Sequence, residues 1–263
     1  MWLTQSNAEQ TSTNKTVCNN GYLPRIILTS LSELKFFTTP AHDCSYLENR
    51  QATTLFADPD AIIDTDAYTS LSMVGFRRSG QHIYKPYCDD CNACNPARVP
   101  VARFTYSRSQ KRILKKNADI SITRQLPRLD PAYFELYERY ITQRHADGDM
   151  FPATMDQFES FLVNGRPEAV FYEYHNRDKL FAVSVVDQLN DSLSAIYTFF
   201  DPQEQKRSLG TLSVLLLIEE TRRLGLHYLY LGYWIKECQK MSYKSNYQPL
   251  EIFQHNRWVE QLK

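Results

Sequence analysis

The fold is decided by residues 194–220, SAIYTFFDPQEQKRSLGTLSVLLLIEE. The β-branched and aromatic residues at 193–200 predict a strand, which ends at Asp201-Pro202 because proline cannot donate to a strand ladder. Six of the seven residues 212–218 are apolar, which predicts a helix buried on most sides. Strand, loop with Gly210 and helix N-terminus together form a mouth, where free backbone N–H groups face an anion or a carbonyl oxygen.

Strand patterns on both sides of this stretch extend it into a sheet. Residues 169–174, 180–187 and 193–200 have connections short enough only for hairpins, so we expect an antiparallel meander. The buried helix ends at Gly225, and the strand expected at 228–232 runs parallel to the third strand. A last helix carries Lys240 and Lys244 one turn apart. This order is that of an acetyltransferase-like (GNAT) fold, so we expect an α+β protein with a mixed sheet, flanking helices and a smaller Cys-containing N-terminal domain.

The whole chain has the composition of a globular protein. Its 30 basic and 30 acidic residues cancel, so net charge alone indicates no polyanion partner. No apolar run is long enough for a membrane span or a signal peptide, which favours a cytoplasmic location and no membrane partner. We expect a poorly ordered extension over residues 1–30, the Cys-containing domain over 31–125 and the acetyltransferase-like domain over 126–263.

The cysteines form one conspicuous pattern. Cys88-x-x-Cys91-x-x-Cys94 has ligand spacing for zinc or an iron–sulfur cluster, and Cys44 would complete four thiolates from an earlier loop. The alternative is that these four residues are reduced structural thiols, since a chain of this length with six cysteines does not have a disulfide framework.

A basic helix follows the cysteines. Ser107-x-x-Gln110 is a capping-box pattern, which predicts a helix start. No acidic residue occurs between Arg98 and Lys116, and the helix carries five basic side chains at three- and four-residue spacing, namely Arg108, Lys111, Arg112, Lys115 and Lys116. Such a surface is either solvated or faces an anion.

Several motifs occur in an order that resembles the arginyl-tRNA–protein transferase superfamily, from about residue 36 to residue 258. They include RRSG at 77–80, YKPYCDDCNACNP at 84–96, RHADG at 144–148, YTFFDP at 197–202, RSLG at 207–210 and YLGYWI at 230–235. The resemblance is to the bacterial branch, which transfers leucine from leucyl-tRNA to proteins with N-terminal Asp or Glu and so marks them for degradation by the N-end rule pathway. It implies an aminoacyltransferase that requires no cofactor for transfer, because the aminoacyl ester is already activated.

The resemblance also implies roles for residues at the mouth. Backbone N–H groups around Leu209 and Gly210 would stabilise the oxyanion. Asp201 would accept a proton from the attacking amine or orient it, with a plain turn residue as the alternative. His145 is a second candidate base, with a polar helix-end residue as its alternative.

Substrate-binding roles follow from the same resemblance. An acidic acceptor side chain favours Arg, so Arg77, Arg78 and the adjacent Ser79 are the first candidates. Further substrate-binding candidates are Tyr197, Phe199 and Trp234 for the leucyl side chain, Lys240 and Lys244 for acceptor or tRNA, and Arg207 in the RSLG loop. The basic helix is expected to contact the tRNA phosphates.

Three other functions remain open at this point. An arginyl-transferring member of the same family would need an acidic pocket for the donor side chain. A zinc-dependent nucleic-acid-binding module would use the cysteines and the basic helix, but leaves the second half of the chain unexplained. A coenzyme A-dependent acetyltransferase is disfavoured because Leu212 would crowd a pyrophosphate.

Overall fold

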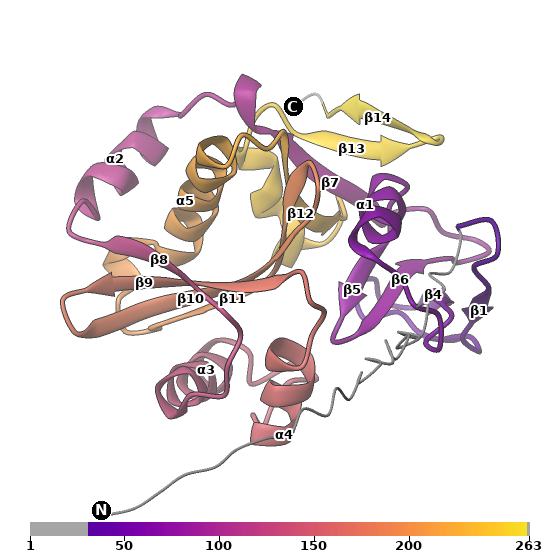
Figure 1. The fold of residues 1–263 in the computed structure, drawn as a ribbon, viewed down its shortest axis with the longest axis horizontal. Coiled ribbons are helices and arrows are strands. Elements are labelled where there is room, and N and C mark those ends of the chain that lie inside the picture. Colours follow the sequence, from indigo (N-terminus) through magenta and orange to yellow (C-terminus); the bar gives the residue numbers. More distant parts are fainter. Residues whose placement is uncertain (1–30, 262–263) are drawn as a thin grey trace, which may run out of the picture.

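The computed structural model describes residues 31–261, so the expected extension at 1–30 lies outside the described residues. An eight-stranded sheet with the order β14-β13-β7-β12-β11-β10-β9-β8 forms most of the protein (Figure 1). Its strands are β7 (Asn95–Pro100), β8 (Ser121–Gln125), β9 (Ala169–Asn176), β10 (Lys179–Gln188), β11 (Ser192–Phe200), β12 (Tyr228–Trp234), β13 (Glu251–Gln254) and β14 (Arg257–Glu260).

The expected α+β class and strand order are confirmed. Strands β9, β10 and β11 form the antiparallel meander, and β11 is followed by α5 (Leu209–Arg223) and then by β12, which pairs with β11 in parallel. The fold is therefore the expected mixed sheet with flanking helices.

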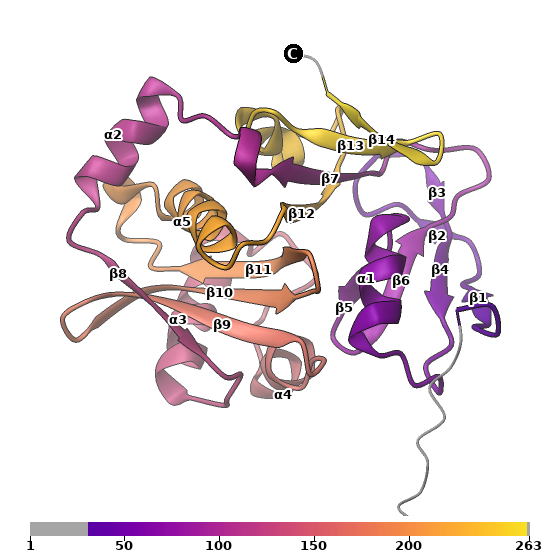
Figure 2. The same cartoon turned by 45° about the horizontal axis from the view of Figure 1, so that its top comes forward.

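Helices cover both faces of this sheet (Figure 2). On one face, Leu215, Leu217 and Ile218 of α5 are fully buried against β9, β10, β11 and β12, and α2 (Arg108–Lys116) packs beside α5. On the other face lie α3 (Pro131–Arg144), α4 (Met155–Phe158) and a π-helical turn (Glu159–Val163). Apolar burial on both faces makes this sheet the core of the protein.

Two features of the large sheet differ from the expectation. Strands β7 and β8 precede residue 126, yet β7 pairs with β12 and β13, and β8 pairs with β9. The sheet thus draws strands from both sides of the expected domain boundary. The expected last helix is not an α-helix but the 3₁₀ helix η4 (Gln239–Asn246), and the hairpin β13–β14 follows it.

The N-terminal part forms a smaller unit at one end of the large sheet. Its four-stranded sheet has the order β1 (Phe36–Thr38), β4 (Thr54–Ala57), β6 (His82–Pro86), β5 (Arg77–Ser79), and beside it lie α1 (Thr65–Met73) and the hairpin of β2 (His42–Asp43) and β3 (Gln51–Ala52). The 3₁₀ turn η1 (Val101–Arg103) follows β7 and packs against α5. Tyr68, Leu71 and Phe76 share one apolar cluster with Tyr230 of β12 and with Leu189, in the turn between β10 and β11. The two sheets therefore pack through a common core.

Strands β11 and β12 part soon after they meet. They pair only at residues 192–194 of β11 and 228–230 of β12. Beyond that point β11 continues against β10, whereas β12 continues against β7. We call this region, bounded by residues 195–200 and 231–234, the fork. A loop of residues 201–208 with a 3₁₀ turn (Gln205–Arg207) leads from the end of β11 to the N-terminus of α5, where a Cβ atom on Gly210 would contact the Phe200 ring, so the mouth predicted from the sequence lies at the fork.

Candidate active site

The first turn of α5 presents free backbone donors. Its N-cap, Ser208, has a left-handed conformation (φ 55°) and makes no side-chain capping hydrogen bond, and the first turn has no acidic residue. The N–H groups of Leu209 and Gly210 therefore have no capping side chain and carry the positive end of the helix dipole. A Cβ atom at Gly210 would lie 3.2 Å from the Phe200 ring, so this approach of helix to strand favours glycine.

The loop before α5 is fixed by residues around the end of α2. Arg207 donates to both oxygens of Asp119, at 2.9 Å each, and to Asn117 Oδ1 at 3.2 Å. Asn117 in turn donates to the Arg207 carbonyl at 2.9 Å. Arg207, predicted to bind substrate, thus braces the loop in this structure. Leu212 packs in an apolar cluster with Leu209 and Phe181.

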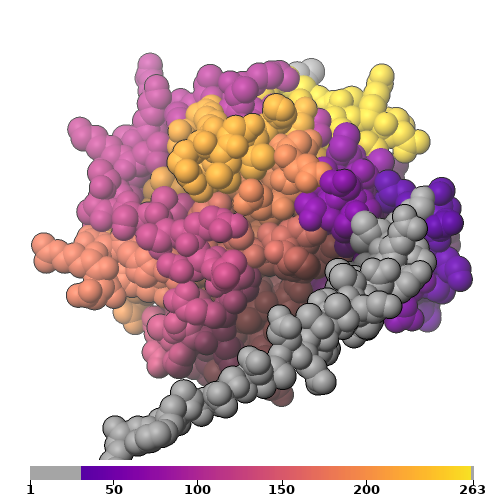
Figure 3. Space-filling model, in the orientation of Figure 1, coloured from indigo at the N-terminus to yellow at the C-terminus, as the bar shows by residue number. Residues whose placement is uncertain are grey.

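Helix α2 forms as predicted and places its charges in solvent. Ser107 and Gln110 form the predicted capping box. The five basic side chains are exposed, and they make no ion pair with any residue from 31 to 261; they are Arg108, Lys111, Arg112, Lys115 and Lys116. Figure 3 shows this magenta segment beside α5, in orange, at the surface. Gln110 also donates to the Asn246 carbonyl of η4, at 3.0 Å. The basic helix therefore connects η4 to the mouth.

His145 lies near the mouth on the opposite side from α2. Its Nε2 atom is 3.0 Å from the Tyr140 hydroxyl, and the Tyr140 ring packs 4.7 Å from that of Phe200. Burial, with Lys240 and Arg144 nearby, lowers the pKa of His145. The imidazole is thus neutral near pH 7 and can accept a proton. Lys240 forms an exposed ion pair with Asp147 at 2.9 Å.

Asp201 takes part in a turn. Its Oδ1 atom accepts from the Gln203 backbone at 3.0 Å, and its Oδ2 atom lies 3.3 Å from Lys179. These contacts are those of the turn-residue alternative. Between the two candidate bases, the geometry favours His145.

Lys244 of η4 is a buried cation at the fork. Only 6% of the residue is exposed, and its ammonium donates to the Tyr233 carbonyl on the part of β12 that no longer pairs with β11. A Cβ atom on Gly232, which has φ of 77°, would lie 3.8 Å from the ammonium. Burial, and secondarily Arg77, lowers the pKa of Lys244 to about 8.

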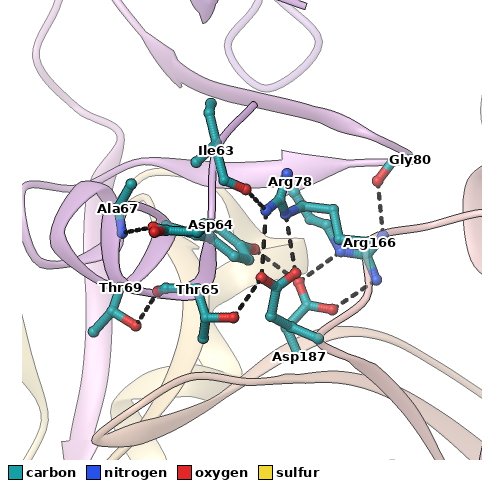
Figure 4. Close-up of polar contacts among 11 residues, drawn as sticks. Ile63, Asp64, Thr65, Ala67, Thr69, Arg78, Gly80, Arg166 and Asp187 are labelled. Carbon is teal, nitrogen blue, oxygen red and sulfur yellow. Dashed lines mark hydrogen bonds and ion pairs between the residues drawn. The ribbon is translucent and has the colours of Figure 1, made fainter. Parts of the chain in front are cut away.

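Arg77 and Arg78 are both 4% exposed but have different partners. Arg78 binds Asp187 of β10 through two hydrogen bonds of 2.6 and 2.8 Å and donates to the Gly80 carbonyl (Figure 4). Tyr68 also donates to Asp187, at 2.7 Å. Arg78 thus joins the small sheet to the large one. Arg77 contacts only backbone carbonyls through Nη1, and its Nε and Nη2 atoms have no hydrogen-bond partner among residues 31–261.

The other four residues predicted to bind substrate differ in burial and in location. Tyr197 is half-buried, 6.4 Å from Tyr140 by ring centroids, at the mouth side of β11. Phe199 is fully buried in the core under α3 and α4. Trp234 belongs to the core cluster on the α5 face of the large sheet, and it lines a cavity of about 570 Å³ beside the cysteine loop. Ser79 is exposed on β5. Of these four, Tyr197 lies in the best position to contact a substrate at the mouth.

The four cysteines expected to hold a metal do not fit one in this structure. Over residues 31–261, no three His, Cys, Asp or Glu side chains form a group suited to a metal ion. Burial raises the pKa of Cys94 to about 12, and the neighbouring Cys44, Cys88 and Cys91 add to this shift. Cys94 is therefore a protonated thiol, and we assign the four cysteines no step in a reaction.

Comparisons with known proteins identify the family of this chain. The family description "Arginine-tRNA-protein transferase, N terminus" matches residues 42–112, and the corresponding C-terminus description matches residues 132–254. These matches define the class of protein as a transferase that uses aminoacyl-tRNA and a protein acceptor.

Individual relatives narrow this class. Aspartate/glutamate leucyltransferase of Pseudomonas paraeruginosa is 53% identical over 88% of this chain and 99% of its own length. That of Alcanivorax borkumensis is 54% identical over 89% of this chain and 97% of its own. The chain belongs to the aspartate/glutamate leucyltransferase family. The crystal structure of FemX is similar with a TM-score of 0.44 and 8% identity over 80% of this chain and 81% of that chain.

Sequence reasoning missed several residues that shape the site. Asn117 and Asp119 hold the loop before α5, Tyr140 links His145 to Phe200, and Asp187 pairs with Arg78. Only Asn117 had a local signal, because an asparagine at the end of a helix is a common cap.

No described helix is long and apolar enough to cross a membrane.

Proposed function

We propose that this enzyme transfers leucine from leucyl-tRNA to the α-amine of proteins that begin with Asp or Glu, marking them for N-end rule degradation. The observation that supports it most directly is the connection of the exposed basic helix α2 to both η4 and the loop before α5. A tRNA acceptor stem bound along α2 would have its aminoacyl end at the mouth.

The proposed reaction depends mainly on aligning the acceptor amine with the ester carbonyl, because the aminoacyl ester is already activated. The α-amine attacks the ester carbonyl, the carbonyl oxygen becomes an oxyanion, and the bond to the tRNA 3′-terminal ribose oxygen breaks. The N–H groups of Leu209 and Gly210, at the uncapped start of α5, would donate to that oxyanion. Neutral His145 would accept the proton that the amine loses, directly or through the Tyr140 hydroxyl, and return it to the ribose oxygen as the ester bond breaks.

The donor side chain fits an apolar environment. Tyr140, Tyr197 and Phe200 form an aromatic group beside the mouth, in which the Tyr140 ring centroid lies 6.4 Å from that of Tyr197 and 4.7 Å from that of Phe200. Such rings favour a leucyl side chain over an arginyl one, which would need an acidic partner.

The test is incubation with leucyl-tRNA or arginyl-tRNA and peptides that begin with Asp, Glu or Ala. We expect leucine on the Asp and Glu peptides only. Transfer of arginine instead would contradict the donor assignment, and transfer of neither amino acid would overturn the proposed activity. Location in the cytoplasm belongs to the same proposal and is checked by cell fractionation.

A further inference from the structure

The two faces of the small sheet differ in what covers them. On one face, Ala57 of β4 and Ile83 of β6 are buried in the apolar cluster that includes side chains of α1 (Figure 2). Phe36 of β1 pairs with Ala57 and so lies on this face, where its ring centroid is 5.3 Å from that of Phe76. This face is therefore part of the core shared with the large sheet.

The opposite face of the small sheet carries aromatic side chains on three neighbouring strands. Phe37 of β1 pairs with Phe56 of β4, and Phe56 pairs with Tyr84 of β6. Because directly paired residues of antiparallel strands lie on the same face, these three side chains form a row, which we call the aromatic row. Phe37 is 52% exposed, Phe56 and Tyr84 are half-buried, and none of the three belongs to an apolar core cluster of the described residues. A group of aromatic side chains outside the core is typical of a binding surface.

The aromatic row leads from the fork to a cavity. At the fork, the Tyr233 ring centroid lies 6.1 Å from that of Tyr84, and the Tyr84 ring centroid lies 5.9 Å from that of Phe56. His82, on the same face of β6 as Tyr84, lies 6.1 Å from Phe56 by ring centroids. His82 also lines a cavity of about 290 Å³ together with residues 165–167. A ligand that follows these rings would be continuous with one bound at the fork.

The chemistry of the aromatic row favours a polypeptide over the tRNA. A single-stranded nucleic acid needs cations beside the stacking rings for its phosphates, and the row contains no Lys or Arg. The exposed cations of α2 lie at the opposite end of the large sheet from the small sheet (Figure 1). A protein acceptor has variable residues after its first one, and aromatic rings can contact apolar atoms of any such segment.

We propose that the aromatic row binds the residues that follow the N-terminal Asp or Glu of the acceptor, as an extended chain from the fork toward the cavity at His82. This assignment rests on the proposed function and deepens it. An extended chain advances about 3.3 Å per residue, and successive rings from Tyr233 to His82 are 5.9 to 6.1 Å apart, so this path spans about five residues. The row thus adds affinity for an unfolded N-terminal segment without selecting its sequence.

The experiment measures leucyl transfer on peptides that begin with Asp, continue with uncharged residues and lengthen by one residue at a time. For the wild type we expect KM to fall with length and to level off once about five residues follow the Asp, with kcat nearly constant. Phe37→Ser should raise KM on the long peptides roughly 2- to 10-fold, the effect of one lost aromatic contact. It should leave kcat, KM on the shortest peptide and KM for leucyl-tRNA unchanged.

Two control variants test whether the effect belongs to the aromatic row. Phe36→Ser changes the neighbouring side chain on the opposite face, and Leu126→Ser changes a side chain that is 72% exposed between β8 and α3. Both should keep the wild-type dependence of KM on peptide length. The assignment is overturned if KM of the wild type is independent of length, or if Phe37→Ser raises KM for leucyl-tRNA instead, which would give the row to nucleic acid.

A second measurement needs no tRNA. An Asp peptide with a benzophenone side chain at its fourth residue is irradiated with the folded wild-type protein, and the attachment site is found by mass spectrometry. We expect attachment within β4 or β6, reduced by an excess of unlabelled Asp peptide. Attachment outside the small sheet would contradict the assignment. If the wild type transfers no leucine at all, the proposed function fails, while this cross-link still tests the aromatic row.

Discussion

The face of the large sheet under α5 and the junction with the small sheet are stabilised in different ways. Under α5, Leu215, Leu217 and Ile218 are fully buried among apolar side chains. At the junction, the ion pair of Arg78 and Asp187 has side chains with 0% exposure, and Arg77 nearby lacks an anion among the described residues. Small changes in apolar packing reduce the stability of the folded protein gradually. A buried charge, in contrast, loses its stabilisation when its one partner is removed. The junction is therefore the more sensitive of the two regions to the loss of a single charged group.

The largest expected effect is at the junction's ion pair. Asp187→Ala leaves Arg78 buried without an anion, so the free energy of unfolding should fall by about 3–5 kcal/mol. The double variant Arg78→Met/Asp187→Leu should recover most of this loss, because it removes both charges. Urea unfolding at pH 7 measures both. As the matched change under α5, Leu217→Ala should cost roughly 3 kcal/mol. A double variant no more stable than Asp187→Ala would contradict the charge explanation.

A smaller effect is expected from Lys244, in the opposite direction. Because folding lowers its pKa to about 8, the unfolded state holds the proton more tightly between pH 8 and 10, and wild-type stability rises through that interval. At pH 7 the free energy of unfolding of Lys244→Met should exceed that of wild type by about 2 kcal/mol after loss of the bond to Tyr233. Unfolding curves of both proteins at pH 7 and pH 10 should show this gap closing. A gap independent of pH would contradict an unpaired buried cation.

The smallest effect on stability is expected at the exposed charges of α2. Lys111→Gln and Lys115→Gln should change the free energy of unfolding by less than about 0.5 kcal/mol. Each should weaken leucyl-tRNA binding severalfold and reduce the slope of log affinity against log salt by about 1. Filter binding at several salt concentrations measures this, with Lys35→Gln as the control. An unchanged slope in both would place the tRNA elsewhere.

Local sequence patterns correctly predicted the helices and strands on the α5 face of the large sheet. The run of apolar residues gave α5, the hairpin connections gave the meander, and the Ser107 capping box gave α2. Each of these depends on residues close together in the chain, which a period or a cap reveals.

The junction escaped prediction for the opposite reason. Arg78 and Asp187 are 109 positions apart, and Tyr68 and Asp187 are 119 apart, so no local spacing relates them. Arg77 and Arg78 are also indistinguishable as neighbours in sequence. Only the strand register shows that one side chain reaches Asp187 and the other lies over Tyr230. The roles of the individual site residues stay predictions for the experiments above.

The position of β7 bears on how the protein can be divided. This strand lies within the region matched by the N-terminal family description, yet it is inserted between β12 and β13 of the sheet that the C-terminal region builds. The two regions can be told apart in sequence comparisons, but separating the chain between residues 112 and 132 would remove an interior strand from one fragment and leave it unpaired on the other. The unit that sequence comparison recognises is therefore not the unit that folds, and exchange of halves between relatives should succeed only when β7 travels with β12.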